Sequence, residues 1–320
     1  MRIDPRIAAL RGDPALQRKA RTVLEGVRDD WLEGPFAPFY TDLVDYGEGR
    51  SLQDCPRLSQ LLTCCETANR IFEALFEPMT LRLAEYPLGQ VPLRHQRSNG
   101  LSMIQLGRTG RATMTLLCYD ELEQSPETIS FSDGECHELV LRGAGDFRFV
   151  ELLEERGGKA ALDQTVRRLI PGEAMRIDGF GQARTVERVY GRLVMLRLAR
   201  TQENARPTRQ YSLNDGTLLH SASGTKAESQ REMAMALLGR MNRNDAAPLL
   251  EELSREGGGH IRWQTLRECL ALDTARGFAA LSRIASDADD DLSTQAGALR
   301  AQLLETYPTL AKLEGQTCPA

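Results

Sequence analysis

The sequence predicts an α+β protein in which a β-rich middle segment is flanked by helical segments. Apolar residues recur at helical spacing up to about residue 90 and again from about 226 onward. Between these limits they form short runs rich in β-forming residues. We therefore expect a helical N-terminal segment over 1–90, a β-sandwich or barrel domain over 91–225 and a helical-repeat domain over 226–320.

The N-terminal segment predicts two helices separated by a loop. Residues 14–31 carry an apolar stripe at helical spacing, and Asp13 precedes them as a candidate cap. Residues 34–49 contain the proline and glycines typical of a loop. A second helix is expected to begin at Pro56 and to stop or kink at Pro78, because proline lacks the amide hydrogen that a helix interior uses.

The middle segment predicts ten short strands, each bounded by Gly, Asn, Asp or Pro. They are expected at 101–107, 111–119, 127–132, 136–142, 146–152, 173–178, 183–189, 192–200, 207–213 and 217–222. Residues 158–170 predict a short helix between two of them. Asp133-Gly134 and Asp215-Gly216 favour two-residue hairpin turns, because these dipeptides accept positive φ angles.

The C-terminal segment contains an apparent internal repeat. Five positions recur after a shift of 28 residues, and in each unit an Asp is placed to cap the second helix. The two sets are Leu238, Met241, Asp245, Leu250, Leu253 and Leu266, Cys269, Asp273, Phe278, Leu281. A shorter third unit begins near Leu292. The segment 226–310 resembles HEAT-like helical repeats, which implies a protein-binding surface or a structural cap; ordinary antiparallel helices are the alternative.

The composition favours a folded cytoplasmic protein. Hydrophobic residues make up 41% and charged residues 27%, and the net charge of -5 disfavours partners that are bound through phosphate neutralisation, such as nucleic acid or an anionic membrane. Seven cysteines without a C-x-x-C pair indicate reduced thiols. Neither a signal peptide nor a membrane span is predicted. The excess of Arg over Lys indicates a GC-rich bacterial genome.

The strand count, Cys136-His137-Glu138 and Leu169-Ile170-Pro171-Gly172 resemble a cupin over about 91–222. The resemblance implies a small β-barrel and, in metal-binding members, an oxygenase or isomerase. Those members have two histidines one residue apart, a nearby Glu and a late histidine after a Pro–Gly turn. Here His137 stands alone, and Met175 occupies the place of the late histidine. We therefore expect no cofactor; the alternative is one divalent metal held by His95, His137, Glu138 and His220.

Strand geometry separates these candidates further. His137 and Glu138 are neighbours on one strand, so they are expected on opposite faces. A two-residue turn at Asp215-Gly216 would pair Tyr211 with His220 on the inner face. His220 is then either a ligand or general base in a pocket, or a core histidine bonded to Tyr211. For His137 the alternative to a metal ligand is a solvent-facing strand residue.

A basic run at Arg94-His95-Gln96-Arg97 suggests an anion pocket, with a solvated strand face as the alternative. The candidate ligand-binding residues are therefore Arg94, His95, Arg97, Tyr211 and His220. Two hypotheses follow. The first is a non-enzymatic ligand-binding or regulatory protein with a small molecule in the β domain and a protein partner on 226–310. The alternative is a metal-dependent enzyme of cupin type.

Overall fold

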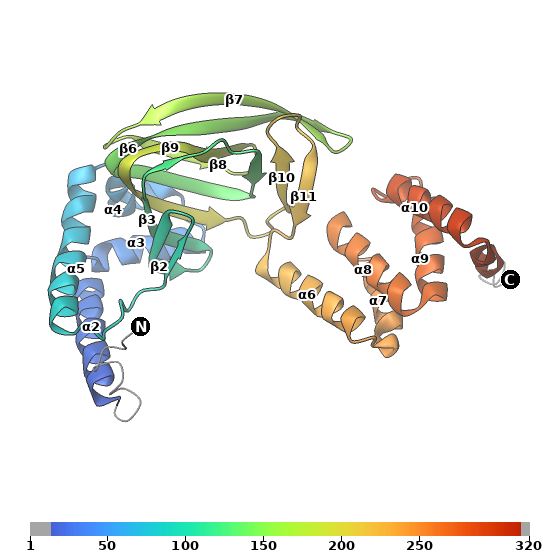
Figure 1. Ribbon diagram of the computed structural model, residues 1–320, viewed down its shortest axis with the longest axis horizontal. Coiled ribbons are helices and arrows are strands. Elements are labelled where there is room, and N and C mark those ends of the chain that lie inside the picture. The colour runs from blue at the N-terminus through green and yellow to red at the C-terminus, as the bar shows by residue number, and fades with distance from the viewer. Residues whose placement is uncertain (1–13, 315–320) are drawn as a thin grey trace, which may run out of the picture. The chain divides into compact units, whose positions relative to one another are not determined.

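The computed structural model describes residues 14–314, and it confirms the α+β class, with helices before and after an antiparallel sheet (Figure 1). The helices are α2 Ala15–Glu33, α3 Ala37–Glu48, α4 Pro56–Leu61, α5 Cys65–Glu85, α6 Lys226–Arg240, α7 Ala247–Leu253, α8 Gly259–Leu272, α9 Thr274–Ser286, α10 Ser293–Thr306 and α11 Ala311–Glu314, with short 3₁₀ turns at Leu52–Asp54, Asn244–Ala246 and Pro308–Leu310. None of the helices within 14–314 has both the length and the apolar character needed to cross a bilayer.

The strands form two antiparallel sheets. They are β1 His95–Ser98, β2 Leu101–Thr109, β3 Ala112–Tyr119, β4 Leu122–Glu123, β5 Thr128–Phe131, β6 Gly134–Arg156, β7 Lys159–Leu169, β8 Ala174–Asp178, β9 Gln182–Thr201, β10 Thr208–Ser212 and β11 Leu218–Ala222. The larger sheet has the order β1-β2-β3-β9-β6-β7, with β4 also paired to β9 and β8 to β6. The smaller sheet has the order β11-β10-β5.

The chain divides into two compact units rather than the three predicted domains. The first runs to Ala205 and includes Gln210–Leu219, and the second comprises Arg206–Arg209 and the chain from His220. The predicted N-terminal segment is not separate, because its helices share one apolar core with β2, β3, β6 and β9. Within this core the Trp31 indole donates a hydrogen bond of 2.8 Å to the carbonyl of Ile71.

The N-terminal helices differ from the prediction in three places. Helix α3 lies inside the predicted loop 34–49, and it forms because Phe39, Leu43 and Tyr46 are buried on one face. The helix expected from Pro56 ends at Leu61, and α5 begins at Cys65. Pro78 lies inside α5 without ending it. The predicted cap Asp13 lies outside the described residues.

The β segment has fewer and longer strands than predicted. The runs 136–142 and 146–152 belong to the single strand β6, and 183–189 and 192–200 belong to β9. The predicted helix at 158–170 is wrong, because these residues form β7 and pair with β6 from Arg156↔Lys159 onward. Gly157 and Gly158 make the connecting turn with φ angles of +58° and +75°.

Neither predicted two-residue turn has the expected geometry. Asp133-Gly134 does not join a hairpin, since β5 pairs with β10 and β6 pairs with other strands. At the second site the Ser212 amide donates to Thr217 O and the Gly216 amide donates to Ser212 O, so the loop takes four residues. This shifts the register by two residues and places Leu218, instead of His220, opposite Tyr211.

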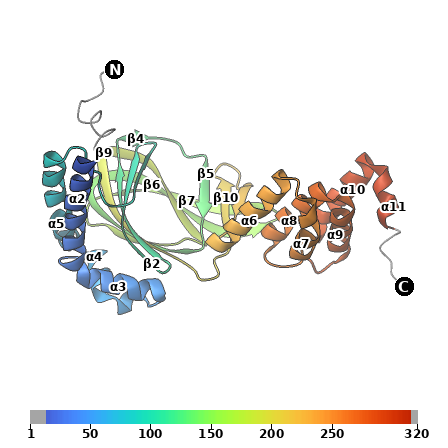
Figure 2. The same ribbon diagram turned by 90° about the horizontal axis from the view of Figure 1, so that it is seen from below.

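The larger sheet bends sharply along β6 and β9, and one of its faces is concave (Figure 2). The register of this pair shifts at Val140/Arg142, Arg142/Ala144 and Asp146/Phe147. Gly143 stands at the second of these shifts with φ +83°, and a Cβ atom there would lie 2.0 Å from the carbonyl oxygen of Arg192. These bulges let one continuous strand follow the curve.

The C-terminal unit consists of the helices α6 to α11. Its main apolar core gathers around Leu266, Phe278 and Leu281. Of the two predicted caps, Asp273 is confirmed, because its side chain accepts the amide hydrogen of Arg276 at the start of α9. Asp245 is not a cap, because it pairs with Arg243 in the 3₁₀ turn that precedes α7.

We expect Gly143→Ala to lower the free energy of unfolding by at least about 2 kcal/mol, because it adds a left-handed strain and a clash with the Arg192 carbonyl. Gly181→Ala is the matched control, since a Cβ there meets no atom within 4 Å. Urea denaturation of both variants measures the difference. Equal stability of the two would show that the bulge at Gly143 does not need a glycine.

Candidate functional site

A buried ion cluster lies on the concave face of the larger sheet. Strand alternation places Cys136 and Glu138 of β6 on this face, and Glu138 lies directly opposite Arg197 of β9. The Glu138 side chain is completely buried, Arg184 is 5% exposed and Arg197 is 33% exposed. One carboxylate is therefore surrounded by two guanidinium groups.

The geometry of the cluster is that of charge-assisted hydrogen bonds. Arg184 binds both carboxylate oxygens of Glu138 through Nε and Nη2, each at 2.7 Å. Arg197 donates through Nε to Oε1 at 2.6 Å. Arg184 also donates to the Tyr119 hydroxyl at 3.4 Å and lies over the ring of Phe147. The cluster uses the forked geometry in which arginine binds carboxylates most strongly.

The protonation states of the cluster are fixed by these contacts. Burial raises the pKa of Glu138, but the charges of Arg184 and Arg197 outweigh it and lower this pKa to about 2. Burial, with the charge of Glu138, raises the pKa of the Cys136 thiol to about 12. A general acid or base works best with a pKa near the operating pH, and a cysteine nucleophile needs its thiolate. Neither group meets these requirements near pH 7.

The opposite face of the same strand carries a second cluster that anchors helix α3. Tyr46 of α3 donates its hydroxyl hydrogen to Glu135 at 2.8 Å, and Arg200 also binds Glu135. His137 lies on this face, with Nε2 3.7 Å from a Glu135 oxygen. Burial lowers the pKa of His137 against the opposing charge of Glu135, so the ring is neutral near pH 7. As predicted, His137 and Glu138 lie on opposite faces.

The candidate metal ligands do not fit a metal. Among the described residues no group of three His, Cys, Asp or Glu side chains is arranged to hold one. Both oxygens of Glu138 are bound by cations, which also repel a divalent ion. His95 is exposed on β1, where Nδ1 lies 2.9 Å from Leu93 O, and His220 is exposed on β11. The pocket position predicted for His220 is wrong: the longer turn keeps it on the face of Tyr211 and Leu218 but moves it away from Tyr211 along β11, where its side chain is exposed.

The other predicted ligand residues are not brought together either. Arg94 and Arg97 are exposed at the β1 edge of the larger sheet, and Arg97 pairs with Asp120 at 2.9 Å. Tyr211 is fully buried on β10 of the smaller sheet, in an apolar cluster with Phe131 and Leu213. The basic run at 94–97 is thus a solvated strand, which was the alternative interpretation.

A cavity of about 280 Å³ borders the buried cluster on its concave side. Met175 lies directly opposite Glu138, Phe149 lies directly opposite Arg184, and both line the cavity. Polar groups in its wall come from Glu151, Asp163, Thr165, Arg167, Arg176 and Gln182. The guanidinium of Arg167 lies over the ring of Phe149, 5.0 Å from its centre.

Arg184, Arg197 and the cavity were not predicted from the sequence. A usable signal was present in β9, where Leu196 and Leu198 face the helices while Leu193, Met195 and Arg197 share the other face. An arginine at an inward position requires a buried acidic partner. The partner could not be identified, because the bend that brings Arg184 close involves the whole sheet.

No family model matches the chain, and no curated protein matches its sequence. Similar solved structures are cupin-fold proteins. One is a cupin superfamily protein from Desulfitobacterium hafniense, with 17% identity, 33% of this chain and 83% of that chain covered, and a TM-score of 0.24. Another is the Drosophila melanogaster CENP-C cupin domain, with 13% identity, 38% of this chain and 96% of that chain covered, and a TM-score of 0.28. A third is hydroxypropylphosphonic acid epoxidase from S. wedmorenis, with 11% identity, 33% of this chain and 55% of that chain covered, and a TM-score of 0.26. Likeness at these TM-scores carries no argument about ligand, partner or reaction.

We expect Glu138→Gln to lower the free energy of unfolding at pH 7 by about 3 kcal/mol, because it leaves two buried cations without a countercharge. The exposed Glu154→Gln is the control. The folded pKa of Glu138, about 2, lies below the unfolded value of about 4.3. The contribution is therefore complete above about pH 5 and is lost as the pH falls towards 2.

Urea denaturation of wild type and Glu138→Gln across this pH range measures the effect. The gap between the two should be constant from pH 7 to about pH 5 and should narrow below that. A gap that is independent of pH down to pH 2 would contradict the assignment of a lowered pKa.

Proposed function

We propose that this protein binds a small organic anion in the cavity of its β domain and does not act on it chemically. The observation that carries the proposal is Arg167, whose guanidinium lies on the Phe149 ring in the cavity wall and has no carboxylate within ion-pair distance among residues 14–314. A cation above an aromatic ring, beside an apolar wall, suits an anion with an apolar body.

Several other residues of the cavity suit this ligand class, and the wall's two carboxylates, Glu151 and Asp163, are matched in number by Arg167 and Arg176. Met175 and Ile177 provide an apolar wall, and Thr165 and Gln182 provide hydrogen-bonding groups that fix orientation. The volume of about 280 Å³ is at the lower end of small-molecule sites and suits a ligand of roughly ten non-hydrogen atoms. Binding is favoured over catalysis because the nearby Glu138 and Cys136 are held in unreactive protonation states.

Benzoate is a suitable first probe, since it combines a carboxylate with a ring. We expect benzoate to bind, benzamide to bind at least tenfold more weakly, and Arg167→Ala to remove most of the difference. Arg156→Ala removes the same charge from the same β6–β7 hairpin outside the cavity and is the control. Ligand-observed NMR measures the binding of benzoate and of benzamide to wild type, Arg167→Ala and Arg156→Ala. Equal binding of benzoate to Arg167→Ala and wild type would overturn the proposal.

A second candidate function concerns the C-terminal helices. We infer that 226–310 forms HEAT-like repeats with a protein-binding surface on α6. Met233, Leu237 and Met241 follow one another at four-residue spacing and are 62%, 57% and 56% exposed. On another face of α6, an apolar groove of about 260 Å³ between α6, α7 and α8 is lined by Met235, Leu238 and Leu250. Exposed apolar surface of this kind is typical of interfaces.

The double variant Met233→Asp/Leu237→Asp is expected to remove a protein partner that wild type retains on affinity purification, because the charges break the apolar stripe. Leu81→Asp, equally exposed on α5, is the control and should retain the partner. Quantitative mass spectrometry of the eluates compares the amount of partner protein retained by wild type and by each variant. A partner lost from neither variant, or from both, would argue against this surface.

A further inference from the structure

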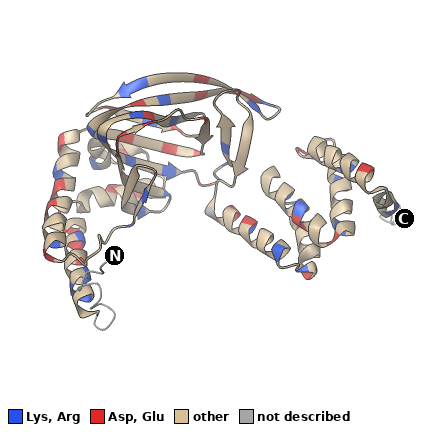
Figure 3. Cartoon of the chain, viewed as in Figure 1, with Lys and Arg blue, Asp and Glu red and all other residues tan. Residues whose placement is uncertain are grey.

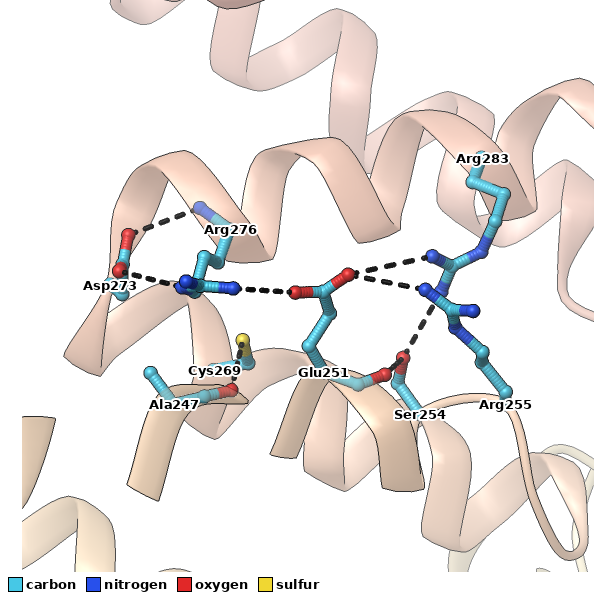
Figure 4. Close-up of polar contacts among 8 residues, drawn as sticks. All are labelled: Ala247, Glu251, Ser254, Arg255, Cys269, Asp273, Arg276 and Arg283. Atoms are coloured by element: carbon cyan, nitrogen blue, oxygen red, sulfur yellow. Dashed lines mark hydrogen bonds and ion pairs between the residues drawn. The ribbon is translucent and has the colours of Figure 1, made fainter. Parts of the chain in front are cut away.

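The C-terminal unit contains a cluster in which three arginines surround one carboxylate (Figure 4). Glu251 of α7 accepts from Arg255 at 3.2 Å on one oxygen and from Arg276 at 3.2 Å on the other. Arg283 is the third, with Nη1 3.9 Å from Glu251. Arg276 and Arg283 stand seven residues apart on α9, which places both on one face of the helix.

The positive charge of Arg283 has no close carboxylate partner of its own in this cluster. Asp273 lies near Arg276 and Asp290 binds Arg262, so the neighbouring acids are engaged elsewhere. Among residues 14–314, Arg283 has only the long contact to Glu251 and a hydrogen bond of 3.4 Å to the Ser254 hydroxyl. Burial, followed by the repulsion of Arg255, lowers the pKa of Arg283. The guanidinium therefore has less negative charge around it than its position requires.

A cavity of about 530 Å³ opens beside Arg283. Its wall also includes Arg300 of α10 and the serines Ser282 and Ser286, one turn apart on α9. The Ser282 hydroxyl oxygen is buried and has no hydrogen-bond partner among the described residues. Phe278 and Leu313 provide an apolar part of the wall. Two guanidinium groups and two hydroxyls thus line one hollow together with an aromatic ring.

From this arrangement we infer that the cavity is a binding site for a phosphate monoester, with Arg283 and Arg300 binding the phosphate and Phe278 and Leu313 contacting the organic group. A phosphate monoester has three terminal oxygens and nearly two negative charges. It therefore matches two arginines and the Ser282 hydroxyl, unpartnered within 14–314, better than a carboxylate, which has two oxygens and one charge; the Ser286 hydroxyl donates to the Ser282 carbonyl at 2.8 Å. The ester is either a free small molecule or a phosphorylated side chain of another protein.

Glu251 provides a test of whether Arg283 binds the phosphate. Among residues 14–314 it is the carboxylate within ion-pair distance of Arg283, so it would compete with a phosphate for the same guanidinium. Removing its charge should therefore tighten phosphate binding, while removing Arg283 should weaken it. A cluster with a purely structural role would not respond to these two variants in opposite directions.

The experiment is calorimetric titration of the full-length protein with phenyl phosphate, inorganic phosphate and a peptide containing phosphotyrosine. We expect phenyl phosphate to bind more tightly than inorganic phosphate, because it also contacts Phe278. Arg283→Ala should weaken binding at least tenfold and Glu251→Gln should tighten it about threefold or more. Arg283→Lys keeps the charge without the fork and should lie between wild type and Arg283→Ala. The exposed Arg267→Ala on α8 is the control and should match wild type.

The two sources of the ester are separated by the peptide, which binds as tightly as phenyl phosphate only if the cavity admits a phosphorylated side chain. Because phenyl phosphate also fits the anion class proposed for the β domain, every protein is titrated in the Arg167→Ala background, so that failure of one proposed site can be distinguished from failure of the other. Thermal melting of each variant identifies any that is unfolded. Phenyl phosphate binding that is absent, or that is insensitive to Arg283→Ala and Arg283→Lys in folded proteins, would overturn the inference.

Discussion

Glu138 accepts hydrogen bonds from two arginines that stand thirteen positions apart on the same strand. A straight strand of that length spans about 40 Å, so both can reach one carboxylate only if β9 bends. A straight strand would leave at least one cation buried without a countercharge. Curvature and charge pairing therefore stabilise each other, and the concave face with its cavity depends on both.

On the opposite face of β6 a second largely buried carboxylate is bound by neighbouring side chains, and there it anchors helix α3. Glu135 stands three residues before Glu138, so strand alternation directs it towards the helices, where Tyr46 and Arg200 bind it. One short stretch of sequence thus holds helix α3 on one side and closes the curved sheet on the other. Charged residues of both signs are interspersed along the strands and helices (Figure 3). The acids at 135 and 138 differ from most of them in being partly or wholly buried.

Sequence analysis predicted the fold class and most strand positions because apolar periodicity is a local property. The prediction was wrong where contacts between distant segments determine the secondary structure. Residues 158–170 have a weak apolar pattern and become a strand by pairing along the whole of β7, although the Gly157-Gly158 dipeptide was a local sign of the hairpin. Helix α3 was missed because its glycines and prolines suggested a loop, while the burial of Leu43 and Tyr46 against the sheet stabilises it.

The candidate sites were harder to predict than the fold. Period-two alternation separated His137 from Glu138 correctly, because that argument needs only one strand. The pairing of His220 with Tyr211 depended on an assumed turn length, and two additional loop residues kept the predicted face but moved His220 away from Tyr211 to an exposed position. Both proposed binding cavities involve arginines, which are so frequent in this chain that no single one stands out in the sequence. Their significance comes from which acids lie nearby and which do not.

The pairing of β6 with β9 also determines the order in which the chain can fold. The hairpin of β6 and β7 closes locally at Arg156↔Lys159, whereas β9 pairs with the far end of β6 at Gly134↔Thr201 and with β3 beyond it. Leu196 and Leu198 of β9 belong to the core beneath the N-terminal helices. During synthesis that core stays incomplete until β9 has left the ribosome, and the apolar faces of α2 to α5 remain open to aggregation or to a chaperone until then.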